Sequence, residues 1–273
     1  MEARLQKRIQ RYGWDRASEQ YAHYWQTQFE PLQTRLLELA DLQAGEKVLD
    51  VACGDGLVSF RAREAVGPEG AVTGDDISEE MIRRADFLRL ERGLENMRFV
   101  RRDAEAPVGA ERSFDAALCS LGLMYVPEPE QALRAMFEAL RLGGRAVAAV
   151  WGQRGRCGWA EVFPIIDAKV KSEVCPLFFR LGTSTALEAD FQAAGFTGVT
   201  SERLAYDLTF ESPEHACGVA MIGGPVALAY ARFDTAIQDA ARAEYLASID
   251  DFRAGAGYEI PGEFVITSGV TPA

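Results

Sequence analysis

The chain has few of the residues from which metal and disulfide sites are usually built. It contains only two histidines, His23 and His215, and its five cysteines lie far apart with no Cys-x-x-Cys pair. A structural zinc site or a disulfide framework needs such residues at close, repeated spacing. The sequence therefore predicts no bound metal. It also predicts that the cysteines are small buried side chains in a reducing compartment.

Positive charge and long apolar runs are also scarce. The 273 residues include 29 Lys and Arg against 41 Asp and Glu, which gives a net charge of −12. A surface that binds nucleic acid normally needs a cationic face, so this balance argues against a nucleic-acid partner. No segment approaches the roughly 18 apolar residues of a membrane span, and the basic start lacks the apolar core of a secretory signal. We expect a cytoplasmic protein without a membrane span.

Short apolar segments alternate with amphipathic ones between residues 47 and 151. This alternation is typical of βαβ units and therefore of a parallel sheet. Later in the chain, the pattern predicts a helix over 186–194 that ends at Gly195, helices within 213–254, and a largely helical stretch in the first 40 residues. The predicted strands are 47–51, 71–74, 97–100, 114–118, 145–151, 199–209 and 263–267, and a helix between the fourth and fifth is stopped by Gly143-Gly144.

A glycine loop joins the first predicted strand to the first helix, in the segment VLDVACGDGLVSF at residues 48–60. The dinucleotide fingerprint G-x-G-x-x-G would begin at Gly54 and Gly56, but Ser59 stands at its third glycine. Asp50 ends the strand directly before the loop, and Asp55 lies within the loop. They would repel a pyrophosphate placed at the helix N-terminus. The loop is therefore expected to hold a ligand that is not an anion.

S-adenosylmethionine meets this requirement, since it carries a sulfonium and an ammonium group and no phosphate. At this point the chain resembles the class I S-adenosylmethionine-dependent methyltransferases, whose first motif is acid-x-G-x-G-x-G. Residues 50–56 follow that motif with Ala52 in place of the first glycine. Further matches to the family occur at 74–78, 102–105, 114–120 and 142–145. The nearest group is the ubiquinone/menaquinone biosynthesis methyltransferase-like (type 11) group, through 48–51, 103–105 and 122–125.

The resemblance implies a fold and a domain organisation. It implies a Rossmann-like, doubly wound α/β sheet of seven mostly parallel strands in the order 3-2-1-4-5-7-6, with strand 7 antiparallel. We expect a single methyltransferase domain over 1–273. Within it, 1–42 would form an N-terminal helical cap and 43–152 the cofactor-binding core. Residues 153–273 would complete the sheet and add helical insertions that form a lid on the substrate side.

The resemblance also implies a set of cofactor contacts. Asp76 would accept hydrogen bonds from the ribose hydroxyls, as a carboxylate about 20 residues beyond the loop does in Rossmann-like sites. Ile77 would pack on adenine, and Asp103 would accept from the adenine amino group. The residues predicted at the cofactor are Tyr21, Trp25, Asp50, Ala52, Gly54, Gly56, Asp76, Ile77, Asp103, Ala104 and Cys119.

The implied activity is methyl transfer from S-adenosylmethionine, with S-adenosylhomocysteine as product, to the O, C or N atom of a small and largely apolar molecule. Alignment and a dry pocket would supply most of the catalysis. No general base is assigned, and His23, His215 and Tyr21 are the candidates. Two alternatives stay open, an NAD(P)-dependent oxidoreductase and a non-catalytic cofactor-binding protein. The oligomeric state is not predicted.

Overall fold

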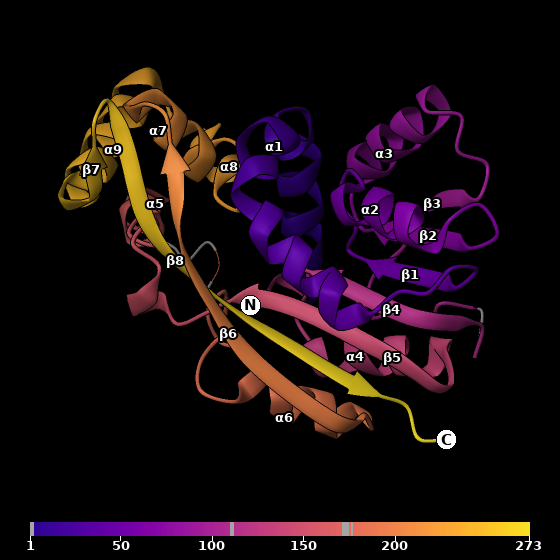
Figure 1. Ribbon diagram of the computed structural model, residues 1–273. Helices are drawn as coiled ribbons and strands as arrows, with labels where there is room; N and C mark the ends of the chain where they lie inside the picture. Colours follow the sequence, from indigo (N-terminus) through magenta and orange to yellow (C-terminus); the bar gives the residue numbers. More distant parts are fainter. Residues whose placement is uncertain (1–2, 110–111, 171–174, 176) are drawn as a thin grey trace.

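The centre of the molecule is a mixed sheet in the order β3-β2-β1-β4-β5-β8-β6, with the two-residue β7 beside β8. The computed structural model describes residues 3–109, 112–170, 175 and 177–273 (Figure 1). Strands β1 to β5 are parallel, and β8 runs antiparallel to both β5 and β6. With β8 as the seventh long strand, this confirms the predicted order. The strands are β1 (Lys47–Val51), β2 (Ala71–Asp76), β3 (Met97–Arg101), β4 (Phe114–Ser120), β5 (Leu140–Trp151), β6 (Thr197–Phe210), β7 (Arg253–Ala254) and β8 (Gly257–Val270).

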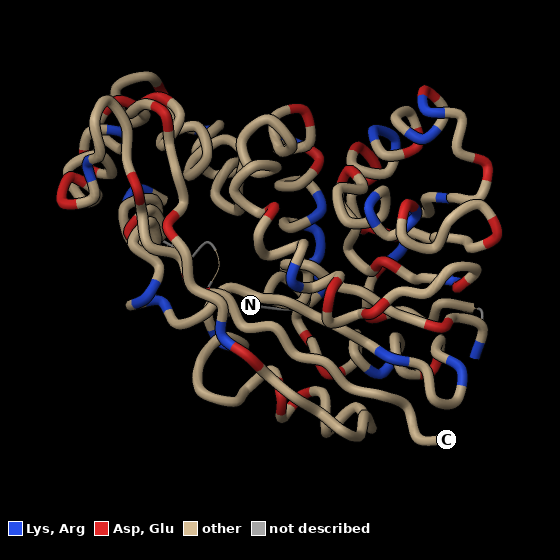
Figure 2. The backbone as a smooth tube through the Cα atoms, viewed as in Figure 1, with Lys and Arg blue, Asp and Glu red and all other residues tan. Residues whose placement is uncertain are grey.

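Helices cover both faces of the sheet. Helices α1, α2 and α3 lie on one face and α4 and α6 on the other, while α5, α7, α8 and α9 gather where β6 ends and β8 begins (Figure 1). Basic and acidic residues are interspersed along the tube in the view of Figure 2. The α-helices are α1 (Ala3–Ala40), α2 (Leu57–Val66), α3 (Glu79–Glu91), α4 (Pro129–Ala139), α5 (Val162–Val170), α6 (Ala186–Ala194), α7 (Pro213–Met221), α8 (Ala227–Tyr230) and α9 (Thr235–Ser248). Three short 3-10 helices are η1 (Leu123–Tyr125), η2 (Arg154–Arg156) and η3 (Asp250–Phe252).

Local capping fixes several of these boundaries where the sequence predicts them. Ser78 caps α3, because its hydroxyl accepts a hydrogen bond from the Met81 amide at 3.1 Å. Helix α6 ends at Gly195, whose φ of 106° lies in the left-handed region. Among the described residues, no helix is both long and apolar enough to cross a bilayer.

The structure corrects the expected boundary between α4 and β5. The helix ends at Ala139 instead of reaching Gly143-Gly144, and β5 already begins at Leu140. Leu140 pairs with Phe114, after which the register shifts. Gly143 has a φ of 71°, and a Cβ on Gly144 would lie 2.8 Å from the Arg141 carbonyl oxygen. The two glycines therefore allow an irregularity inside the strand and do not stop the helix.

Helix α1 is anchored to the sheet through its second half. Its buried apolar residues after Ala17 are Trp25, Phe29, Leu32, Leu36 and Ala40. The buried Gln28 side chain exchanges two hydrogen bonds with the backbone of Thr209 on β6, at 2.5 and 3.0 Å. Because this half is fixed, the first half of α1 is held out toward α3 and the loops at the carboxyl ends of the strands.

Candidate cofactor and acceptor site

A cavity lies where β1, β2 and β4 end, at the edge of the sheet where ligands of such folds bind. It encloses about 930 Å³, counting its open mouth. Eight of the eleven residues predicted at the cofactor line it: Tyr21, Asp50, Ala52, Gly54, Asp76, Ile77, Asp103 and Ala104.

The other three predicted cofactor residues lie elsewhere. Gly56 begins α2 with a φ of 93°, and a Cβ there would lie 2.9 Å from the Phe60 ring, so it shapes the loop from behind. Cys119 is buried within β4, while the next residues, Ser120 and Leu121, line the cavity. Trp25 lines a second cavity, described below.

Ala52, which stands where the family's motif has its first glycine, has a left-handed backbone conformation with a φ of 54°. That conformation costs roughly 1–2 kcal/mol for a residue with a Cβ. Gly122, which follows β4, makes room for this methyl group, since a Cβ on Gly122 would overlap the Ala52 Cβ. Leu121, with a φ of 61°, is a second non-glycine residue in this conformation at the cavity wall. Strain of this kind is concentrated at functional sites.

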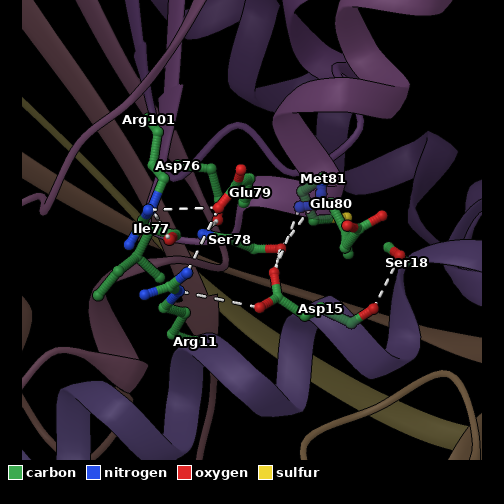
Figure 3. A network of polar contacts seen from close by, with 10 residues as sticks. All are labelled: Arg11, Asp15, Ser18, Asp76, Ile77, Ser78, Glu79, Glu80, Met81 and Arg101. Carbon is green, nitrogen blue, oxygen red and sulfur yellow. Dashed lines mark hydrogen bonds and ion pairs between the residues drawn. The ribbon is translucent and has the colours of Figure 1, made fainter.

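Asp76 holds the glycine loop and the start of α3 together. Its carboxylate accepts a hydrogen bond from the Ser78 amide at 2.8 Å (Figure 3). It also accepts one from the Gly54 amide at 3.0 Å. Each carboxylate oxygen has a second lone-pair site, and Asp76 lines the cavity. The residue is therefore placed to accept from two hydroxyl groups of a ligand while its own geometry is fixed.

Asp50 presents a buried carboxylate with spare acceptor capacity to the cavity. One oxygen accepts from the Ser59 hydroxyl at 2.5 Å, and the other has no partner among the residues that the structure describes. Burial, aided by the nearby charges of Asp75 and Asp76, raises the pKa of Asp50 to about 7. A buried carboxylate of this kind is stabilised by a cation placed against it.

Asp55 does not share this role. It is buried, lies 3.8 Å from the Arg84 guanidinium on α3, and is absent from the cavity lining. Burial raises the pKa of Asp55 to about 6. Of these two acids, only Asp50 lines the cavity.

The sequence reasoning missed a buried ion pair in the cavity wall. The Asp75 carboxylate accepts from the Arg102 guanidinium at 2.6 and 3.1 Å, and both residues line the cavity. The Gly74-Asp75-Asp76 segment offered a signal, but it did not show which acid pairs with an arginine 27 positions away. Burial raises the pKa of Asp75 to about 6, although Arg102 opposes that shift.

The first half of α1 forms a roof over the cavity. Asp15 accepts from the Ser78 hydroxyl at 2.7 Å and from the Glu80 amide at 3.3 Å (Figure 3). Lys7 forms ion pairs with Asp103, at 2.7 Å, and with Glu105. Between these contacts, the Trp14 side chain lines the cavity. None of these three α1 residues was predicted at the site.

A second, aromatic cavity adjoins the first. The two share four lining residues: Trp14, Tyr21, Leu121 and Tyr125. The second cavity measures about 290 Å³, counting its opening, and its other lining residues are Trp25, Phe29, Met124, Trp151, Trp159, Phe178, Gly224 and Pro225. Its only titratable lining groups are the Tyr21 and Tyr125 phenols. Burial raises the pKa of both phenols, so each stays protonated at neutral pH.

The two candidate histidines lie outside both cavities. Their rings are 6.4 Å apart, with His23 exposed on α1 and His215 half-buried on α7. Tyr21 lies at the junction of the cavities, but a protonated phenol donates a hydrogen bond and does not remove a proton. The described lining of the aromatic cavity therefore contains no carboxylate, histidine or lysine that could act as a general base.

Comparisons with known proteins agree with this geometry. Residues 42–171 match a family model described as a methyltransferase domain. The chain is 37% identical over 133 residues to aklanonic acid methyltransferase DauC of Streptomyces sp. (strain C5). This alignment covers 49% of this chain and 60% of that protein. It is 38% identical over 199 residues to nocamycin O-methyltransferase of Saccharothrix syringae, covering 68% of this chain and 70% of that protein.

A solved structure has a similar fold. Phosphoethanolamine N-methyltransferase 2 of Haemonchus contortus, in complex with S-adenosyl-L-methionine, superposes with a TM-score of 0.62 at 14% identity, covering 95% of this chain and 57% of that one. At this identity the likeness concerns the fold alone. The nocamycin relative covers most of both chains, so the protein belongs to the class I S-adenosylmethionine-dependent methyltransferases.

Proposed function

We propose that the protein transfers the methyl group of S-adenosylmethionine to a small, largely apolar molecule. The observation that carries this proposal is the junction between the two cavities, where an acid-lined cavity shares four wall residues with an aromatic one. In-line displacement requires the methyl donor and the acceptor to face each other across a short, dry gap. Such a junction provides that gap.

The cofactor cavity has groups that suit the chemistry of the donor. The unpartnered Asp50 oxygen suits the cationic methionine end, and the spare lone pairs of Asp76 suit the ribose hydroxyls. Ile77 and Asp103 would contact adenine on its face and at its amino group. When bound, the cofactor supplies a sulfonium methyl group and a neutral thioether leaving group.

The protein's own contribution would be alignment and exclusion of water. The aromatic walls leave the acceptor with few polar partners, and the described lining of the aromatic cavity offers no carboxylate, histidine or lysine as a base. The acceptor atom must therefore carry a free lone pair without help from the enzyme, as an acidic phenol, an enol or an unprotonated amine does. An acidic phenol or an enol would lose its proton to solvent before the transfer, whereas an amine would lose its proton to solvent after the new N–C bond has formed.

We propose that the whole chain acts as one methyltransferase domain, with 1–42 as the cap, 43–152 as the cofactor core and 153–273 completing the sheet and the acceptor side. The net charge of −12 supports free small molecules, and not nucleic acid, as acceptors. A cytoplasmic location fits such substrates.

Calorimetric titration distinguishes this function from the two alternatives. We expect S-adenosylhomocysteine to bind and NAD(H) and NADP(H) not to bind, because the buried acids would repel a pyrophosphate. Binding of a nicotinamide dinucleotide instead would favour the oxidoreductase. A turnover screen against small phenols, amines, thiols and quinone precursors then separates an enzyme from a non-catalytic binding protein.

A further inference from the structure

Gln33 is an unexplained residue in the wall of the cofactor cavity. It lies in the second half of α1, is 5% exposed and lines the cavity, yet no hydrogen bond joins its amide to another described residue. The amide atoms are not fully enclosed, unlike the unpaired oxygen of Asp50, so the amide borders the space of the cavity. Buried polar groups are almost always paired. A ligand that pairs with this amide explains why it is there.

Gln28 provides an internal comparison on the same helix. It is also 5% exposed, but its amide nitrogen donates to the Thr209 carbonyl at 2.5 Å and its amide oxygen accepts from the Thr209 amide at 3.0 Å. One of these two buried glutamines is therefore paired with the protein's own backbone. Gln33 is left unpaired in a cavity that a ligand can enter.

Contacts between α1 and α2 show at which end of the cavity Gln33 lies. Arg61 of α2 donates to the hydroxyl of Thr34, the residue after Gln33, at 2.7 Å. Leu57 is one helical turn before Arg61 and lines the cavity. Asp50 is tied to α2 as well, through the hydroxyl that it accepts from. Gln33 therefore lies at the end of the cavity that holds Asp50 and the start of α2.

The start of α2 favours a negative group at this end. Its first turn contains no acid, no side chain caps it, and its first two residues, Leu57 and Val58, line the cavity. The first N–H groups of a helix lack acceptors within the helix and carry partial positive charge. Asp50 presents the opposite charge nearby. An α-amino acid end matches both, because it holds a carboxylate beside an ammonium, whereas a pyrophosphate has no cation to offset Asp50.

The amide of Gln33 suits such a carboxylate. Its NH₂ group has two donors, and hydrogen bonds to an ionised acceptor are stronger than those between neutral groups. Because the amide is neutral, it does not compete with a ligand's ammonium for Asp50. A lysine or arginine at this position would instead pair with the free oxygen of Asp50 and occupy the site.

We propose that Gln33 is a specificity-determining residue of the cofactor site. Its amide N–H donates a hydrogen bond to the carboxylate at the methionine end of the cofactor, while Asp50 binds the adjacent ammonium group. This rests on the proposed function only in taking the cavity as the S-adenosylmethionine site. The binding step requires no methyl transfer, so it can be tested separately.

The test compares three ligands that share an adenosine and a thioether. S-adenosylhomocysteine carries the carboxylate and the ammonium, its decarboxylated form carries only the ammonium, and 5′-methylthioadenosine carries neither. Gln33→Leu removes the amide at similar size. We expect it to weaken binding of S-adenosylhomocysteine about tenfold and binding of the other two less than twofold, as measured by calorimetry on the full chain.

Two further variants complete the comparison. Asp50→Asn is expected to weaken both ligands that carry the ammonium and to spare 5′-methylthioadenosine. Gln26→Leu makes the same substitution as Gln33→Leu at an exposed position of α1 and is the matched control, for which we expect no change with any of the three ligands.

Two readouts separate a ligand contact from a structural role. Because the Gln33 amide has no partner among the described residues, Gln33→Leu breaks no hydrogen bond in the free protein, and its melting temperature should not fall. In a ¹⁵N-glutamine-labelled sample, the Gln33 amide is identified as the side-chain signal missing in Gln33→Leu. We expect S-adenosylhomocysteine to move this signal downfield, and the decarboxylated form to cause no comparable shift.

Three results would overturn the proposal. They are unchanged affinity for S-adenosylhomocysteine in Gln33→Leu, equal losses for all three ligands together with a lower melting temperature, and a wild-type protein that binds 5′-methylthioadenosine as tightly as S-adenosylhomocysteine. If the wild-type protein binds none of the three, it is the proposed function that is contradicted, so the two failures are distinguishable.

Discussion

Among the carboxylates that line the cofactor cavity, Asp76 is the one best placed to bind the cofactor. It joins the glycine loop to α3 through two backbone hydrogen bonds and faces the cavity. We expect Asp76→Ala to weaken binding of S-adenosylhomocysteine at least tenfold, because two ribose hydroxyls lose a charged acceptor. Asp115→Ala is the matched control, since Asp115 begins β4 and accepts from the Lys47 amide at 2.7 Å. Unchanged affinity in Asp76→Ala, measured by calorimetry, would refute the ribose role.

The raised pKa values of the buried acids predict that cofactor binding releases protons. Without ligand, Asp50 has a pKa of about 7 and Asp76 one of about 6, mainly because of burial. A bound cation favours the ionised form, so at pH 6.5 protons leave on binding, whereas at pH 8.5 few remain to leave. Titration of S-adenosylmethionine in buffers of different ionisation enthalpy measures this release. A heat of binding that does not vary with buffer at pH 6.5 would contradict it.

The same acids give the stability of the free protein a definite dependence on pH. A carboxyl whose folded pKa is raised binds its proton more tightly in the folded state than in the unfolded one. Its contribution is full below the unfolded value near 4 and is lost as pH rises through the folded values of about 6 to 7. We therefore expect these groups to lower the melting temperature between pH 5 and pH 7.5, and Asp50→Asn to reduce that slope. A slope of opposite sign that Asp50→Asn leaves unchanged would contradict this.

Ala52 and Gly122 form a second residue-scale pair. Ala52 has a left-handed backbone conformation, which is unfavourable for a residue with a Cβ, and Gly122 leaves room for the Ala52 methyl group. We expect Gly122→Ala to lower the free energy of unfolding by about 2 kcal/mol through this clash, and Ala52→Gly to recover part of the loss in the double variant. Denaturant unfolding of the four proteins measures the coupling. Strict additivity would show that the two side chains do not meet as described.

At the scale of elements, the two halves of helix α1 have different roles: one half anchors the helix to the sheet, and the other covers the cofactor cavity. Its second half is fixed to β6 through Gln28, and its first half covers the cofactor cavity through Lys7, Trp14 and Asp15. We expect Asp15→Ala to speed dissociation of S-adenosylhomocysteine severalfold in stopped-flow measurements, because the roof loses its hydrogen bonds to Ser78 and Glu80 at the start of α3. The exposed Glu19→Ala on the same helix is the control. Equal dissociation rates in both variants would show that the roof does not restrain the ligand.

Elements specified by local signals were predictable from the sequence. Strands β1 to β4 and the start of α3 follow from apolar periodicity and the Ser78 cap, which involve near neighbours only. By contrast, β8 spans Gly257–Val270 and not only 263–267, because it pairs with β6 along almost all of that range. Helix α5 was not predicted either, in a segment whose apolar residues gave no clear period. Pairing and packing with distant segments decided both.

At the scale of the whole molecule, local sequence signals predicted the cofactor cavity but not the aromatic cavity, which depends on contacts between distant segments. Strand-terminal acids located the cofactor cavity, since the carboxyl ends of parallel strands meet at one edge. The aromatic cavity could not be predicted, because Trp25, Trp151 and Trp159 are brought together only when α1, β5 and the segment before α5 pack against one another. The sequence likewise did not reveal that Asp55 turns away from the cavity where Asp50 faces it.

The central claim is that the two joined cavities transfer a methyl group to a small molecule. Its most direct test incubates the wild-type protein with tritiated S-adenosylmethionine and a panel of phenolic aryl ketones, enols, amines and thiols. We predict that tritium passes to a product that can be extracted into an organic solvent. Label that stays on the cofactor with every acceptor, or that accumulates in added nucleic acid, would contradict the account.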